Sequence, residues 1–269
     1  MLRERIESNL ELPLQSQTTA EVLALSTSDG CDAQGLSDLI QRDQSLAGHV
    51  LGIANSAAYA PVEPIVSLQQ AVSRLGVDVI VEIALAISLK GKVFDVPGYD
   101  SLIREMWIHA TASAVYAKEI ARVMRSNVEG AFMCALLHDV GRPLVLQNLV
   151  DLVRSQTDQS IPAKIIEAAM NEFHECVGDK MVTHWALPEW MANVVAHHHN
   201  YAEEGENREA ALIVDLADAL ATWALDEGAG EGEFNSSMEA LNELNLYSDE
   251  LRILMDLREQ ILEGAEAFL

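Results

Sequence analysis

The sequence is short of basic residues. Its 269 residues include 17 lysines and arginines against 42 aspartates and glutamates, which gives a formal net charge of −25 at pH 7. A surface with such an excess of negative charge repels phosphate backbones and anionic lipid headgroups. We therefore expect no nucleic acid and no membrane among its partners.

Cysteines are also scarce. Cys31, Cys134 and Cys176 lie far apart, and no two of them form a CxxC pair. An odd number of scattered thiols is typical of reduced intracellular proteins rather than of disulfide frameworks. The opening residues, MLRERIESNLELPL, lack the apolar core of a signal peptide, and the longest apolar run, 77–89, is interrupted by two carboxylates. We expect a cytoplasmic protein without a membrane-spanning segment.

Strand patterns are missing too. Apolar residues recur at spacings of three and four through almost the whole chain, and aromatic residues make up only 5% of it. These features predict an all-α fold. Turn-forming residues in 91–101, among them Pro97 and Gly98, interrupt the helical period. We expect two helical lobes, an N-terminal one at 1–95 and a second at 96–269 that ends in closing helices.

Residues able to bind metal ions gather in the second of these lobes. Six of the eight histidines and several aspartates lie on segments that otherwise have the pattern of core helices. Imidazole nitrogens and carboxylate oxygens together suit divalent iron, manganese, zinc or nickel. A carboxylate within an apolar helix is costly unless it is bonded. The set comprises His109, His138, Asp139, His174, His197, His198, His199, Asp215 and Asp218.

The number and spacing of these residues favour two ions over one. Adjacent helical residues such as His138 and Asp139 point about 100° apart, so both can reach metals that lie off the helix flank. Asp215 and Asp218 share a helix face and could act as ligand and orienting group, or as ligands in turn. Six or seven ligands exceed the needs of one tetrahedral ion. If the helix faces converge, they suit two bridged ions that activate water for phosphoester hydrolysis.

Each residue taken alone has a simpler interpretation. A single helical histidine such as His109 is more often a hydrogen-bonded core or rim residue than a metal ligand. The run 197–199 suits the negative end of a helix dipole, where histidine is mildly favourable, and Asn200 can stop that helix. Convergence in space therefore decides between a metal centre and scattered structural histidines.

The order of these residues resembles that of a known superfamily. The succession H, HD, H, HH and D, with the pair set in ALLHDVG, is similar to the HD superfamily of metal-dependent phosphohydrolases. The segments LSDLIQRDQSLAGHVLGIANSAAY and SLQQAVSRLGVDVI look more narrowly like the HDOD family, the HD-related output domain of bacterial signalling proteins. The residues that carry this resemblance are Leu12-Pro13, Asp43, Ala54-Asn55-Ser56, 71–76, Trp107, Gly178, 185–188 and His197-His198.

The resemblance implies an all-helical signalling module that binds partner proteins and commonly lacks part of the metal set. Comparison with the related HD-GYP phosphodiesterases, which hydrolyse cyclic di-GMP, implies that this chain retains the set. One or two divalent transition-metal ions are then the expected cofactors. The ligands so implied are His109, His138, Asp139, His174, His197, His198 and Asp215, with Asp218 as an orienting or alternative ligand.

Two functions stay open on the sequence, beside a third and weaker alternative in which the pocket is a vestige that binds a nucleotide or metal without turnover. The first is a bacterial cytoplasmic output or adaptor module that binds signalling proteins. The second is a metal-dependent phosphohydrolase or cyclic-dinucleotide phosphodiesterase with a nucleotide or phosphoester ligand, in which Asp139 is catalytic and Arg142 or Lys180 steadies the phosphate. Where the Gly-Tyr-Pro signature of HD-GYP enzymes should follow the histidines, the chain reads NYAEEG, which favours the first. The amphipathic tail, 234–269, suits closing helices or, alternatively, a homodimer contact.

Overall fold

The computed structural model describes residues 2–8, 10, 12, 20–21, 33–56, 59, 63–93, 96–156, 160–201, 205–226 and 238–268. Within these ranges every regular element is a helix, and the expected all-α fold is confirmed. None of the described helices combines the length and the apolar character that a bilayer span requires. Of the expected features, Cys31, Pro13 and the acidic pair Glu203-Glu204 lie outside the described residues.

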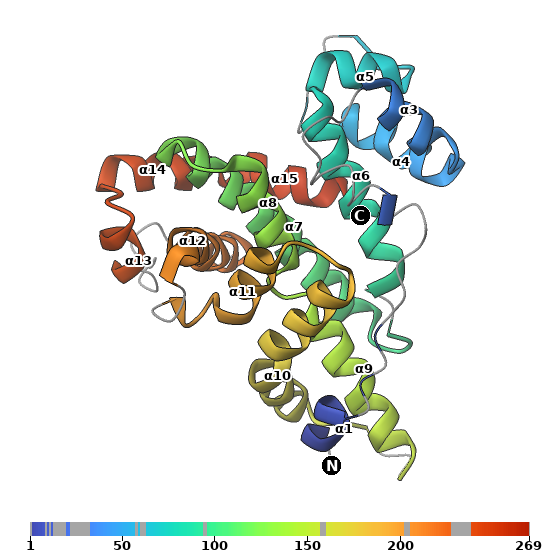
Figure 1. Cartoon of the computed structure of the whole chain (residues 1–269), viewed down its shortest axis with the longest axis vertical. Coiled ribbons are helices and arrows are strands. Elements are labelled where there is room, and N and C mark those ends of the chain that lie inside the picture. The colour runs from blue at the N-terminus through green and yellow to red at the C-terminus, as the bar shows by residue number, and fades with distance from the viewer. Residues whose placement is uncertain are drawn as a thin grey trace.

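A first lobe stands apart in space, at the upper right of Figure 1. Its helices pack on one another around a buried apolar core. They are α3 (Ala33–Gln41), α4 (Gln44–Ala54), α5 (Leu68–Leu75) and α6 (Val77–Val93).

Short polar side chains set the helix boundaries of the first lobe. The Asp43 carboxylate accepts hydrogen bonds from two backbone N–H groups at the start of α4, each at 3.0 Å. The Ser67 hydroxyl caps α5 in the same way. Asn55 follows α4, donates to the Ile65 carbonyl at 2.8 Å and accepts from the Ile65 N–H at 2.7 Å, which ties the two ends of the α4–α5 connection together.

The second lobe forms the larger body of the molecule. The long helix α7 runs through it and packs against α8, α12 and α15 (Figure 1). Its helices are α7 (Asp100–Met124), α8 (Val128–Leu137), α9 (Gly141–Arg154), α10 (Ala163–His184), α11 (Glu189–His197) and α12 (Arg208–Leu225), with a 3-10 turn at Gly205–Asn207.

The C-terminal helices α13 (Met238–Glu243), α14 (Ser248–Asp256) and α15 (Arg258–Ala267) follow. Helix α13 packs on α12, whereas α14 and α15 pack on α7. The Phe268 carbonyl accepts hydrogen bonds from the Lys90 ammonium of α6 and the Trp107 indole of α7, both at 3.1 Å. The end of the chain therefore joins the two lobes. A homodimer contact through this tail stays a prediction.

The first helix, α1 (Leu2–Ser8), lies on the second lobe although the sequence assigned 1–95 to an N-terminal lobe (Figure 1). The Lys180 ammonium of α10 donates to the Ile6 carbonyl at 2.9 Å, and the Arg5 guanidinium donates to the Asn148 amide oxygen of α9 at 2.9 Å. Apart from this helix, the division of the chain at residue 95 stays a prediction.

Two glycines allow α9, α10 and α11 to come close. A β-carbon at Gly141 would lie 2.1 Å from the His174 carbonyl oxygen, and one at Gly178 would lie 2.8 Å from the Val195 side chain. A larger residue at Gly141 would require a backbone shift, and one at Gly178 would require the Val195 side chain to move. This contact brings the turn between α8 and α9 against the middle of α10.

We expect Gly141→Ala to lower the free energy of unfolding by about 1–3 kcal/mol or more, because the added methyl group overlaps the α10 backbone. Gly52→Ala, in α4, is the matched control, since a β-carbon there meets nothing within 4 Å. Urea denaturation of both variants checks the expectation. Equal stability of the two would show that the α9–α10 contact is loose.

Candidate metal centre

Histidines and aspartates from separate helices meet in the second lobe. His109 comes from α7, His138 and Asp139 follow α8, and His174 comes from α10. The centroids of neighbouring rings lie 5.5 Å apart for His109 and His138, and 5.3 Å apart for His174 and His198. The expected convergence of distant segments is therefore present in the fold.

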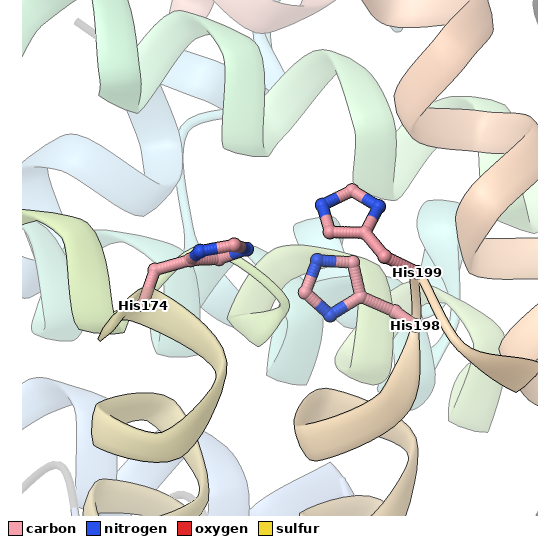
Figure 2. A group of neighbouring side chains, drawn as sticks. All are labelled: His174, His198 and His199. Carbon is pink, nitrogen blue, oxygen red and sulfur yellow. The ribbon is translucent and has the colours of Figure 1, made fainter. Parts of the chain in front are cut away.

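Two helix ends position four of these side chains. Helix α8 ends at Leu137, so His138 and Asp139 occupy the tight turn before α9. Helix α11 ends at His197, so His198 and His199 occupy the turn that follows. Figure 2 shows the rings of His198 and His199 turned toward His174 of α10.

Three buried imidazoles have one ring nitrogen fixed by the backbone. The Nδ1 atoms of His138, His174 and His198 lie 2.6, 3.0 and 2.8 Å from backbone carbonyl oxygens of their own helices. A carbonyl only accepts, so Nδ1 carries the proton and donates it. Their Nε2 atoms are buried and have no hydrogen-bond partner among the described residues. A backbone-bound Nδ1 with a free Nε2 is the arrangement of a metal-binding histidine.

Asp139 lies between two groups of possible ligands. Its Oδ2 atom is 3.4 Å from His138 Nε2, and its Oδ1 atom is 3.6 Å from His174 Nε2. Within each group the ligand atoms all lie within 4.8 Å of one another. The first group is His109, His138 and Asp139, and the second is His174, His198 and His199.

Burial and charge set different protonation states across the cluster. Burial lowers the pKa of His174 to about 4, and burial with the neighbouring His138 holds the pKa of His198 well below its usual range. Burial would also lower the pKa of His138, but the carboxylates of Asp139 and Asp218 raise it to about 9. Without a cation from outside, His138 is therefore protonated at neutral pH and lies beside the carboxylates of Asp139 and Asp218.

The two aspartates of α12 differ in their positions. Asp218 Oδ1 lies 2.9 Å from His109 Nε2 and 3.8 Å from His138 Nε2, so this carboxylate belongs to the centre of the cluster. Asp215 Oδ1 lies 4.0 Å from His199 Nδ1, and hydrogen bonding to Asp215 raises the pKa of His199. The sequence resemblance had implied Asp215 as the ligand and Asp218 as the accessory residue.

The histidine pair is shifted by one residue from the expected one. His197 is the last residue of α11, and its Nδ1 lies 3.1 Å from the Asn193 carbonyl oxygen. Neither ligand group within the described residues includes His197, whereas His199 completes the second group. His197 as a ligand stays a prediction, and the turn that follows α11 brings His199 to the second group in addition to His198.

The two expected phosphate-binding residues lie in different places. Arg142 Nε is 2.6 Å from Asp139 Oδ2, and its Nη1 donates to the Asn171 amide oxygen at 3.0 Å. Lys180 is wrongly assigned to the site, because its ammonium donates to the Ile6 carbonyl of α1. Six residues along a helix correspond to a rotation of about 120° from His174, so Lys180 faces away.

A cavity of about 670 Å³ opens beside the first ligand group. His109, Asp139, Arg142 and Asp218 supply its polar wall, and side chains that include Met106, Met170 and Leu225 supply an apolar wall. The ligand groups of His109 and Asp139 are therefore accessible to a small molecule.

A family comparison identifies the kind of protein. The HDOD domain family matches residues 12–201. The chain belongs to the HDOD family. The family expected from the sequence is thus confirmed, whereas the ligand set of HD-GYP type stays a prediction. A curated relative, an uncharacterized protein of Treponema pallidum (strain Nichols), is 24% identical over 197 residues, which cover 71% of this chain. The chain spans only 38% of the length of that relative.

Solved structures share the HDOD fold over nearly the whole chain. A Geobacter sulfurreducens HDOD domain protein of unknown function has a TM-score of 0.72 and 23% identity, and the match covers 99% of this chain and 95% of that one. A Shewanella amazonensis SB2B protein, provisionally described as a metal-dependent phosphohydrolase, has a TM-score of 0.75 and 16% identity over 98% and 96% of the two chains. A Marinobacter aquaeolei VT8 protein, provisionally described as a signal transduction protein, has a TM-score of 0.73 and 23% identity over 98% and 61%.

We expect the free energy of unfolding of the metal-free protein to fall as pH decreases from about 6.5 to about 4. The unfolded state binds a proton at His174 near pH 6.5, whereas the folded state binds it only near pH 4. The loss from this residue reaches about 3 kcal/mol. The raised pKa of His138 gives the opposite slope above pH 6.5, because its stabilising proton is lost as pH rises toward 9.

Urea denaturation in the presence of a chelator, at several pH values between about 7 and 4, measures this slope. His174→Gln should make it shallower, since the variant has no ionisable group at that position, whereas the part of the slope that comes from His198 remains. His184→Gln, at the exposed end of α10, is the matched control and should keep the slope of the wild type. An unchanged slope in His174→Gln would contradict the assignment.

Proposed function

We propose that this chain is a signalling output module whose histidine cluster binds one or two divalent transition-metal ions. One observation carries the proposal: the Nε2 atoms of His174 and His198 are buried without hydrogen-bond partners among the described residues. The Nε2 atom of His138 belongs to the same cluster and lies 3.4 Å from the Asp139 carboxylate. Buried polar atoms without partners are costly, and a bound cation removes that cost. The mixed imidazole and carboxylate set suits iron, manganese, zinc or nickel.

The described residues could hold a metal ion at each of two places. His109, His138 and Asp139 would hold one ion, and Asp218 would orient His109 or serve as a further ligand. The second group, His174, His198 and His199, would hold the other, and Asp215 Oδ1 lies 4.0 Å from His199 Nδ1. Asp139 lies between the groups and is the residue able to contact both ions.

Two observations support the signalling role: membership of the HDOD family and the strongly negative charge of the chain. Output domains transmit a change of state to another protein, and the net charge of −25 favours a partner with a basic surface. Association with such a partner should weaken as salt is added.

Metal binding to the metal-free protein should release protons. The pKa of His138 is about 9, so this residue carries a proton at neutral pH that a metal ion must displace. Calorimetric titration with Zn²⁺ or Mn²⁺ near pH 7.5, in two buffers of different ionisation enthalpy, should show about one proton released per chain. Affinity should rise between about pH 7 and pH 9.

Variants test which residues take part in metal binding. His138→Ala and His198→Ala should lower the metal content measured after purification without chelator, whereas His184→Ala should not. Because His199 lies in the second ligand group, His199→Ala should lower the metal content more than His197→Ala does. A wild-type protein that takes up less than about one transition metal per chain, even on reconstitution, would overturn the proposal.

A second candidate function is hydrolysis of a phosphoester, and the cavity beside Arg142 favours it. A bound divalent ion would supply Lewis acidity at a phosphoryl oxygen. Asp139 and Asn171 hold the Arg142 side chain at the cavity wall, where the planar guanidinium suits a phosphate group. Met106 and Met170 offer an apolar surface to the rest of such a ligand.

Activity assays of the metal-loaded protein with cyclic di-GMP and with phosphomonoesters distinguish the two functions. Hydrolysis would show itself as turnover proportional to metal content. Asp139→Asn should abolish it, and Arg142→Gln should raise KM by about tenfold or more, as expected for loss of a charge-assisted hydrogen bond. Full metal occupancy without turnover would leave the module as a metal-binding adaptor.

A further inference from the structure

A second cavity, of about 460 Å³, lies between the two lobes and away from the histidine cluster. Its walls come from α5 and α6 of the first lobe, from α7 and α8 of the second, and from α15. We name it the interlobe cavity. Its volume lies in the lower part of the range of small-molecule sites. Among the described residues, none that lines it belongs to the candidate metal centre.

The deep end of the interlobe cavity holds a buried ion pair. The Lys118 ammonium of α7 donates to the Glu82 carboxylate of α6, and the two residues are only 9% and 5% exposed. An ammonium has three N–H donors, and the structure gives Lys118 one hydrogen-bond partner among the described residues. The remaining donors are left for an acceptor in the cavity. Tyr59 lines the same cavity.

The ion pair has no net charge but offers both donors and acceptors. The deep end of the interlobe cavity therefore suits a neutral polar group that has both donors and acceptors. An anion is less suitable there, because the Glu82 carboxylate would repel it. The Phe132 ring lies 5.6 Å from the Lys118 ammonium and lines the cavity beside it, together with Ile261 and Phe268 of the C-terminal region. A flat ring can pack against this apolar wall while its polar edge meets the ion pair.

The outer part of the interlobe cavity has two arginines. Arg74 of α5 donates to the Glu63 carbonyl oxygen at 3.0 Å and lies 3.9 Å from the Glu63 carboxylate. Arg122 of α7 is paired with Glu119, so a phosphate group bound here would replace these two carboxylates. Both guanidinium side chains are about half exposed, and each has five N–H donors. Three basic residues, Arg74, Lys118 and Arg122, thus line one cavity together with two carboxylates, Glu82 and Glu119. Two guanidinium groups beside an opening suit an anion, and their planar shape suits phosphate.

We propose that the interlobe cavity binds a nucleoside monophosphate. The phosphate lies at Arg74 and Arg122, and the base lies against Phe132 with its polar edge at Lys118 and Glu82. Because the walls come from both lobes and from α15, bound nucleotide connects the lobes and stabilises their relative position. This site is separate from the metal centre and does not depend on a bound metal.

Calorimetric titration of the full chain in the presence of a chelator tests the proposal. AMP, GMP, CMP and UMP are the probes, and adenosine and inorganic phosphate are the fragments. At least one nucleotide should bind in the micromolar range, and each fragment should bind at least about tenfold more weakly, because it occupies only one end of the site. Arg74→Gln and Arg122→Gln should each weaken nucleotide binding by about tenfold or more.

Arg252→Gln, on the exposed face of α14, is the matched control and should bind the nucleotide like the wild type. The single variant Lys118→Gln would leave the buried Glu82 carboxylate unpaired and could unfold the protein. The double variant Glu82→Gln, Lys118→Gln therefore tests the deep end of the interlobe cavity. It should no longer discriminate between the bases. His138→Ala should bind normally, which distinguishes this site from the metal centre. Failure of all four nucleotides to bind, binding unchanged by both arginine variants, or tighter binding of a fatty acid or aryl carboxylate would overturn the proposal.

Discussion

The contact between the start of α9 and the middle of α10 is the constraint on which the centre of this protein depends. Gly141 lies so close to the His174 carbonyl that no side chain fits between the two helices. The residues just before Gly141 are His138 and Asp139, so the same contact brings them against His174. A second close approach, of Gly178 to Val195, brings α11 and its following histidines to the same place.

The interior that results is unusual in its polarity. Imidazole rings and carboxylates occupy positions that an all-helical core ordinarily fills with apolar side chains, and His138, His174 and His198 are at most 2% exposed. Hydrogen bonds from Nδ1 to backbone carbonyls satisfy one side of each ring. The other side faces Asp139 or an adjacent ring, where burial and opposing charges shift the pKa values of the histidines in opposite directions. Such divided protonation is typical of sites that bind cations or carry out chemistry.

The two lobes are joined by more than the connection between α6 and α7. The C-terminal region crosses the junction, since the Phe268 carbonyl bonds to Lys90 on one side and to Trp107 on the other. The buried pair of Glu82 and Lys118 also links α6 to α7. A buried ion pair is weak grounds for stability but a common means of specifying one arrangement. The junction is therefore a place where a ligand or a partner protein can influence both lobes.

The sequence by itself determined the helical class, the family and the residue types of the centre. Helical periodicity is local, and the HD pair, the histidine run and the ANSA segment can be read without knowledge of the fold. Tertiary structure decided which of two nearby residues of the same type belongs to the candidate metal centre. Whether His197 or His199 joins His198 depends on where α11 ends, and whether Asp215 or Asp218 faces His109 depends on how α12 is rotated in its packing. Lys180 was misassigned because spacing along α10 does not show which face α1 covers. Such choices depend on contacts between residues far apart in the chain, and local sequence patterns contain no record of them.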